Sequence, residues 1–255
     1  MVGAGGESKS FEGASRTLKR LADLEISGRE VNRLTQKIGE ELANAEQERV
    51  KQHQNTQLEV EVKNPPEAVV VECDGGRIRV RAEGEGAGVH QPAWRETKNA
   101  CLLRVQSETR ADDPHPELPR CFTDHQHMAE LVRGVKNAEN CHPEETEGPK
   151  DTGTEIAADK GSRERQPWEP ERLVRTCLSG MCTSNEFGPR MEAEAQRRGF
   201  FAASRAAFLG DGQAWNWTIH RRHFPGFVAI LDFIHAVTYV YMAAMAVSTD
   251  RPKGW

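Results

Sequence analysis

The hydrophobic positions of the chain change their period several times, and each period predicts a different kind of element. Leucine, valine and isoleucine recur at three- and four-residue steps over residues 18–42, which is the period of an apolar stripe on a helix. Ser27-Gly28-Arg29-Glu30 interrupts this stripe, and Ser27 with Glu30 has the form of a capping box. The pattern predicts two helices joined by a short turn within residues 1–57.

These helices allow two interpretations. In a helix-turn-helix, the second helix would place polar side chains against DNA phosphates or base edges: Arg29, Asn32, Arg33 and Lys37. An ordinary helical hairpin would show the same pattern, and we favour it because the motif is easily mimicked. Arg29, Arg33 and Lys37 are the DNA-binding candidates of this segment.

From residue 58 the hydrophobic period changes to two, which predicts strands. Leu58, Val60 and Val62 alternate with polar residues, residues 69–71 are a continuous apolar run, and residues 78 and 80 alternate with arginines. Asp74-Gly75-Gly76 lies between the last two runs and is predicted to be a hairpin turn, since glycine tolerates positive φ. Another strand is predicted over residues 98–105, so residues 58–106 would supply the first strands of a sheet.

Residues 107–171 lose this periodicity and are rich in proline, glycine, asparagine and acidic residues. We predict an acidic, flexible insertion without a core. Five cysteines and histidines in it could be interpreted as metal ligands, but their spacing matches no common zinc pattern; they are Cys121, His125, His127, Cys141 and His142.

Regular patterns return in residues 172–255, with a helix predicted over 187–198, a strand at 208–209 and a helix starting at Trp215. The apolar run at residues 227–247 is long enough to span a bilayer. Asp232 and His235 would then lie in the hydrocarbon, which is costly. We therefore favour a buried strand over 228–232 followed by an amphipathic helix from His235.

The charge balance limits the choice of partners. With a net charge of -5 over 255 residues, the whole chain has no electrostatic attraction to nucleic acid. Residues 190–223 are locally basic, and Arg221 and Arg222 could contact a phosphate backbone, although a solvated helix face would look the same. The 6 cysteines contain no C-x-x-C and favour reduced thiols, and the N-terminus predicts no signal peptide, so we expect a cytoplasmic protein.

Two apolar runs stop at an aspartate followed by glycine, and these aspartates, Asp74 and Asp211, are the candidate catalytic residues. Carboxylates at strand ends offer a divalent metal hard oxygen ligands on rigid supports, as phosphodiester chemistry requires. The alternative is structural, because aspartate is also a favoured turn residue. A pairing of the two carboxylates in space would favour the metal site.

The order of these elements indicates a fold. A strand with Asp74 and its hairpin partners precede the insertion, and a strand with Asp211, a helix, a strand with Asp232 and a last helix follow. This is the order in a ribonuclease-H-like fold, an α/β class with a mixed sheet, in which carboxylates at adjacent strand ends hold two divalent ions.

Several long motifs occur in an order that resembles bacterial insertion-sequence transposases of the ISKra type. The resemblance covers most of residues 15–247 apart from the insertion, and its motifs lie at residues 71–78, 88–90, 94–98, 210–225 and 230–235. It implies a transposase that cuts and rejoins DNA with an Asp-Asp-Glu set and Mg²⁺ or Mn²⁺. Asp74 matches the first acidic position, Asp211 the second, and Asp232 and His235 a motif between the second and the third.

The third acidic position has no match, since no glutamate follows Glu194. The resemblance therefore implies an internal portion of a longer transposase, inactive by itself. Its partners would be DNA, at the terminal repeats of a mobile element on the nucleoid, and a further copy of the chain, with no small-molecule substrate and no membrane. The alternatives are a DNA-binding remnant that acts as a repressor or has no activity and, less favoured, a membrane-anchored protein.

Overall fold

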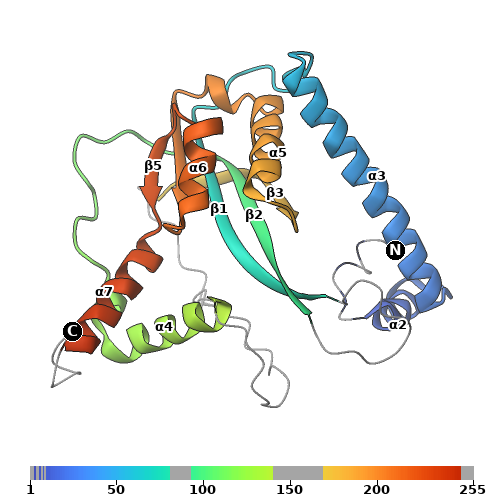
Figure 1. Ribbon diagram of the computed structural model, residues 1–255, viewed down its shortest axis with the longest axis horizontal. Helices are drawn as coiled ribbons and strands as arrows, with labels where there is room; N and C mark the ends of the chain where they lie inside the picture. The colour runs from blue at the N-terminus through green and yellow to red at the C-terminus, as the bar shows by residue number, and fades with distance from the viewer. Residues whose placement is uncertain are drawn as a thin grey trace. The chain divides into compact units, whose positions relative to one another are not determined.

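A computed structural model describes residues 10–80, 93–139 and 169–247, together with positions 3, 6 and 8 (Figure 1). The chain divides into two compact units, Met1–Glu59 and Val60–Trp255. The first is helical, and the second contains a five-stranded mixed sheet with helices. The predicted α/β class is confirmed.

The first unit contains α2 (Phe11–Ala22) and α3 (Gly28–Gln54). Helix α2 ends where Asp23 adopts a left-handed conformation, with φ 51°, and α3 begins where Ser27 Oγ accepts a hydrogen bond from the Glu30 amide at 3.2 Å. A small apolar cluster of Ala14, Leu18 and Val31 joins the two helices. The predicted helices and short turn are therefore confirmed.

The sheet of the second unit has the strand order β3-β2-β1-β4-β5. Its strands are β1 (Ala68–Val80), β2 (Ala93–Gln106), β3 (Glu171–Gly180), β4 (Arg205–Gly210) and β5 (Val228–Leu231). Strand β2 is antiparallel to both β1 and β3, while β1, β4 and β5 are mutually parallel. The carboxyl ends of β4 and β5 consequently lie beside Cys73 of β1, although β1 itself continues to Val80. The carboxyl ends of parallel strands are the usual place for a site in such sheets.

Two strand predictions were wrong. Asp74-Gly75-Gly76 is no hairpin turn, because β1 continues through it and pairs with β2 from Ala68 to Val80. Gly76 is needed in the strand, since a Cβ there would lie 2.9 Å from Thr97 Oγ1. Residues 58–62 form no strand; the Glu61 amide binds the Arg197 carbonyl at 2.8 Å instead.

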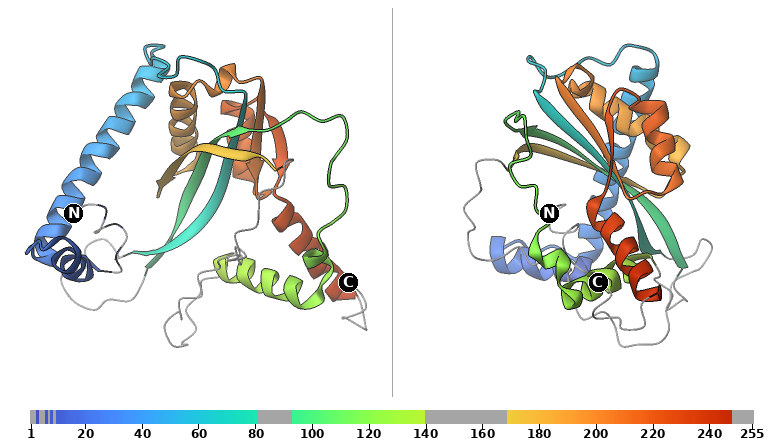
Figure 2. Two further views of the ribbon diagram at one scale, coloured as in Figure 1. Left: turned by 180° about the vertical axis from the view of Figure 1, so that it is seen from behind. Right: turned by 90° about the vertical axis from the view of Figure 1, so that its left-hand side faces the viewer.

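One face of the sheet is covered by α5 (Ser184–Arg197) and α6 (Ala214–His223), both close to their predicted ranges (Figure 2). Alternate residues of the central strands point into the core beneath these helices. The core contains Val71, Leu102 and Phe208 of the sheet, together with Met191, Ile219 and Phe224. The short helix η2 (Phe200–Ala202) leads from α5 toward β4. This packing fixes the ends of β1 and β4 relative to each other.

The first part of the predicted insertion differs from our expectation of no core. After η1 (Arg120–Thr123), residues His125–Glu139 form α4, which packs against α7 (Phe233–Val247) (Figure 2). Met128 and Val132 are buried against Val237 and Tyr241. The acidic composition of the surrounding residues obscured this short apolar stripe. Residues 140–168 lie outside the described part.

The apolar run at 227–247 divides, as predicted, into a strand and a helix, β5 and α7. The prediction that this strand is buried was wrong, because β5 lies at the edge of the sheet and Val228, Ile230 and Leu231 are exposed. Asp232 lies between β5 and α7 and caps the helix: its Oδ1 accepts a hydrogen bond from the Ile234 amide at 2.7 Å. Within the described ranges, no helix has the length and apolarity needed to cross a membrane.

Candidate metal centre

The parallel strands bring the predicted acidic residues to one edge of the sheet. Asp211 directly follows β4, and Asp74 lies one residue beyond the last β1–β4 pair, Cys73 with Gly210. His235 lies in the first turn of α7, directly after β5. One ligand atom each of Asp74, Asp211 and His235 lies within 4.8 Å of the others. The structure thus unites both predicted catalytic aspartates with a residue that the sequence indicated only as accessory.

Hydrogen bonds fix the orientation of the Asp211 carboxylate. Asp211 is 7% exposed, and its Oδ1 accepts hydrogen bonds from the Gln213 amide at 2.9 Å and from the Asn216 side chain. Its Oδ2 accepts from Gln213 Nε2 at 3.0 Å. Asn216 is fully buried and also reaches the Cys73 carbonyl at 3.4 Å, so it ties the ends of β1 and β4 together. Outer hydrogen bonds of this kind orient metal ligands.

Asp74 lies at the accessible side of the cluster. Partial burial and then the neighbouring Asp211 carboxylate raise the pKa of Asp74, while a hydrogen bond from Gly75 and the proximity of His235 act in the opposite direction. Two carboxylates this close repel each other in the absence of a cation. A divalent cation between them would remove this repulsion.

His235 provides a buried nitrogen. Its Nδ1 is inaccessible to solvent and has no hydrogen-bond partner among the described residues. The Asp232 carboxylate is 3.3 Å from it, outside hydrogen-bonding geometry. Through this proximity the Asp232 carboxylate helps to orient the ring, and neutral imidazole can bind a metal through a ring nitrogen. Asp232 itself caps α7 and thereby positions His235.

The donor set therefore fits a divalent cation. Two carboxylates and one imidazole come from three separate elements of the sheet edge, and three protein donors leave coordination positions open for water and phosphate oxygens. Carboxylates suit Mg²⁺ and Mn²⁺, whereas imidazole suits transition metals better than Mg²⁺. The mixed set thus favours Mn²⁺.

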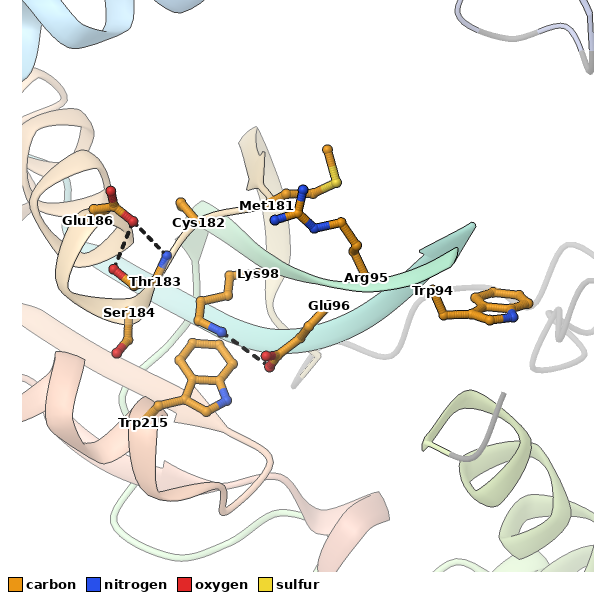
Figure 3. A pocket seen from close by; sticks show the side chains of 10 residues that line it. All are labelled: Trp94, Arg95, Glu96, Lys98, Met181, Cys182, Thr183, Ser184, Glu186 and Trp215. Atoms are coloured by element: carbon orange, nitrogen blue, oxygen red, sulfur yellow. Dashed lines mark hydrogen bonds and ion pairs between the residues drawn. The ribbon is translucent and has the colours of Figure 1, made fainter. Parts of the chain in front are cut away.

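A cleft of about 760 Å³ opens beside the site (Figure 3). The strand β2, the start of α5 and Trp215 of α6 line it, and Gly75 separates it from Asp74: a Cβ on Gly75 would lie 3.8 Å from Trp215. Trp215 Nε1 donates a hydrogen bond to Gln213 Oε1 at 2.7 Å, and Gln213 in turn holds Asp211. Trp215 in the wall of the cleft and the candidate ligand Asp211 are therefore linked through hydrogen bonds to Gln213.

Lys98 is the buried charge of this cleft. It is 7% exposed, pairs with Glu96 at 3.1 Å and lies 4.6 Å above the ring of Trp215, as Figure 3 shows. A buried ammonium needs such compensation. The arrangement holds a positive charge against an aromatic face in the cleft.

The predicted DNA-binding residues are all exposed, and two of them, Arg33 and Arg222, form hydrogen bonds with neighbouring side chains. Arg33 binds Glu30 through two hydrogen bonds, of 2.9 and 2.5 Å, while Arg29 and Lys37 lie on the surface of α3. Arg221 and Arg222 lie in the last turn of α6, where Arg222 binds Asn185 at 2.7 Å. Their role in DNA binding remains a prediction.

The sequence interpretation missed three residues that shape the site: Gln213, Asn216 and Lys98. Gln213 and Asn216 follow Asp211 at steps of two and five, and this spacing at the start of a predicted helix could have indicated side chains that fold back on the carboxylate. No pattern indicated Lys98, because its burial depends on Trp215 from a distant element.

Gly210 provides a test of the support beneath Asp211. A Cβ at this position would lie 3.1 Å from the Asn216 Cβ and 3.2 Å from its Nδ2, so Gly210→Ala should displace Asn216 and destabilise the protein by about 1–3 kcal/mol. Urea denaturation should show a lower free energy of unfolding, and Mn²⁺ titration should show a lower affinity for the metal. Gly226→Ala is the matched control, since nothing lies within 4 Å of its Cβ position; equal effects of the two substitutions would contradict this account.

The fold and the site define an α/β protein with a candidate carboxylate–histidine metal centre at the carboxyl edge of its sheet. Comparison of the chain with protein-family models and with curated proteins found no match. Its function is accordingly argued from the site and from the resemblance of its motifs.

Proposed function

We propose that this chain is a transposase-like protein that cleaves and transfers DNA strands with a divalent metal. The observation that carries the proposal is the convergence of Asp74, Asp211 and His235 within 4.8 Å at the carboxyl edge of three parallel strands. Rigid hard donors at such an edge suit phosphodiester chemistry.

The sheet supports a ribonuclease-H-like core as part of this proposal. After β1 come its antiparallel partner β2 and then β3, which is antiparallel to β2, and two crossovers through α5 and α6 then add β4 and β5 on the other side of β1. This is the element order on which the resemblance to transposases of the ISKra type rests. Asp74 lies one residue beyond the paired part of β1 and β4, and Asp211 and the Asp232–His235 motif follow the ends of β4 and β5.

In this proposal, Asp74, Asp211 and His235 would hold Mg²⁺ or Mn²⁺. The ions would supply activation of a water or 3'-hydroxyl and stabilisation of the leaving oxygen. Gln213 and Asn216 keep the Asp211 carboxylate directed at the site, and Asp232 fixes the helix turn that carries His235. His235 would add a third ligand from the motif that lies between the second and third acidic positions of the resemblance, so three donors would be present without the third acidic position.

The cleft supports DNA as the substrate. Trp215 would stack with a base on the ring face that Lys98 does not cover, and Arg95 would offer positive charge for a phosphate. The nucleotide adjoining the cleaved phosphate would therefore occupy the cleft.

The preference between metals tests this assignment. We expect the protein to bind Mn²⁺ more tightly than Mg²⁺, and His235→Asp to shift the ratio of the two dissociation constants toward Mg²⁺, because a carboxylate replaces the imidazole. Calorimetric titrations of both metals would measure the ratio. Glu25→Gln, an exposed residue of the first unit, is the control and should change neither constant. An unchanged ratio in His235→Asp would remove His235 from the ligand set.

DNA cleavage tests the activity itself. Supercoiled plasmid should be nicked in Mn²⁺ and remain intact in a chelator. If DNA is bound without any cleavage, in a manner that weakens steeply with salt, the repressor-like alternative would replace the transposase proposal.

A further inference from the structure

Two cysteines lie opposite each other on the face of the sheet that α5 and α6 do not cover. Cys101 of β2 and Cys177 of β3 are Cα partners in the antiparallel register. The residues on either side of Cys101, Ala100 and Leu102, point into the core, so Cys101 points to the other face of the sheet. In the registers of the described sheet, they are the one pair of partnered cysteines.

The geometry of such a pair permits a covalent bond. Residues directly opposite in antiparallel strands have Cα atoms about 4.5–5.5 Å apart, within the range of about 4.4–6.8 Å that disulfides span. Both thiols are free, Cys177 is exposed and Cys101 is half-buried. The neighbouring Cys177 thiol raises the pKa of Cys101, as expected for two thiols at paired positions of adjacent strands.

We propose that Cys101 and Cys177 form a dithiol site that is reversibly oxidised to an intramolecular disulfide by a low-molecular-weight disulfide such as oxidised glutathione. The inference rests on the register of β2 and β3 and is independent of the metal site.

The reaction takes place in two exchanges. The exposed Cys177, as its thiolate, attacks the oxidant; one mixed disulfide forms and one glutathione thiolate leaves. Cys101 then attacks the Cys177 sulfur and releases the second glutathione, which takes up the Cys101 proton. Two protein thiols are oxidised and one glutathione disulfide is reduced to two thiols.

The surroundings favour this order of attack. Burial and the neighbouring Cys177 raise the pKa of Cys101 to about 11, so Cys101 remains protonated at neutral pH and is a poor first nucleophile. Cys73 is buried among core residues and has its pKa raised further, so it does not compete. The resulting bond would tie the edge strand β3 to β2.

Intact mass spectrometry of the full-length reduced protein, after incubation with oxidised glutathione and acid quenching, tests the proposal. We expect a loss of two hydrogens without a glutathione adduct, and a linked peptide pair containing Cys101 and Cys177. Cys101→Ser should keep a stable glutathione adduct on Cys177, whereas Cys121→Ser, which removes another exposed cysteine, should behave like the parent protein. A lasting adduct on Cys177 of the parent, or a bond between other cysteines, would overturn the proposal.

A second measurement needs no variant. Phenylarsine oxide bridges two adjacent thiols and releases one water, so one equivalent should protect both Cys101 and Cys177 from alkylation. Unchanged alkylation of the two cysteines would also overturn the proposal.

Discussion

Asp211→Asn should abolish Mn²⁺ binding and DNA cleavage while leaving the metal-free protein folded. Asn retains one oxygen at the position that accepts hydrogen bonds from the Gln213 amide and Asn216, so these two contacts can persist, while the bond from Gln213 Nε2 to Oδ2 is lost. The charge that attracts the cation is lost. We expect a loss of Mn²⁺ affinity greater than the roughly 10–100-fold that removal of an outer-shell partner causes.

The stability of the metal-free protein makes this test specific. The two carboxylates repel each other in the absence of a cation, so removing one charge should keep the unfolding midpoint at or above that of the parent. Added Mn²⁺ should raise the midpoint of the parent and leave that of Asp211→Asn unchanged, because only a bound ligand stabilises the native state. Glu25→Gln should respond to Mn²⁺ like the parent. A Mn²⁺-dependent rise in Asp211→Asn would show that the cation binds elsewhere.

Local sequence patterns predicted most elements of the fold because their hydrophobic periods are regular. The helical hairpin, α5, α6 and the division of the last apolar run into β5 and α7 all followed from period and capping residues. The error at Asp74-Gly75-Gly76 has a non-local cause. These residues favour a turn in isolation, but pairing with Thr97 and Asn99 of β2 keeps them in a strand.

The candidate site could be predicted only in part for the same reason. Asp74 and Asp211 each end an apolar run. Because parallel strands bring such positions together, the proximity of the two aspartates could be predicted from the sequence. The short distance of His235 from Asp74 and Asp211 depends on the direction in which α7 leaves β5. The cap at Asp232 determines this direction. The contact of Lys98 with Trp215 depends on where the distant helix α6 places the Trp215 ring, and it has no local signal.

Phe208→Ala should have the largest effect on stability, since this side chain lies at the centre of the core that supports the site. Phe208 is fully buried on β4, pairs with Val71 of β1, and packs against Phe224 at 5.6 Å and His220 at 5.3 Å between ring centroids. Removing a buried phenylalanine costs about 3–5 kcal/mol, a large part of the total stability of a domain. Urea denaturation followed by tryptophan fluorescence would measure the loss in the second unit, because every tryptophan of the chain lies there.

Phe201→Ala is the matched control. Phe201 contacts the same Phe224 ring at a centroid distance of 5.7 Å but is 42% exposed, so its removal opens no closed cavity and should cost clearly less. If the two substitutions cost the same, β4 would not be the buried centre of the sheet. Asp211 directly follows β4, three residues after Phe208, so Phe208→Ala should also weaken Mn²⁺ binding near its unfolding midpoint, and saturating Mn²⁺ should recover part of the lost stability.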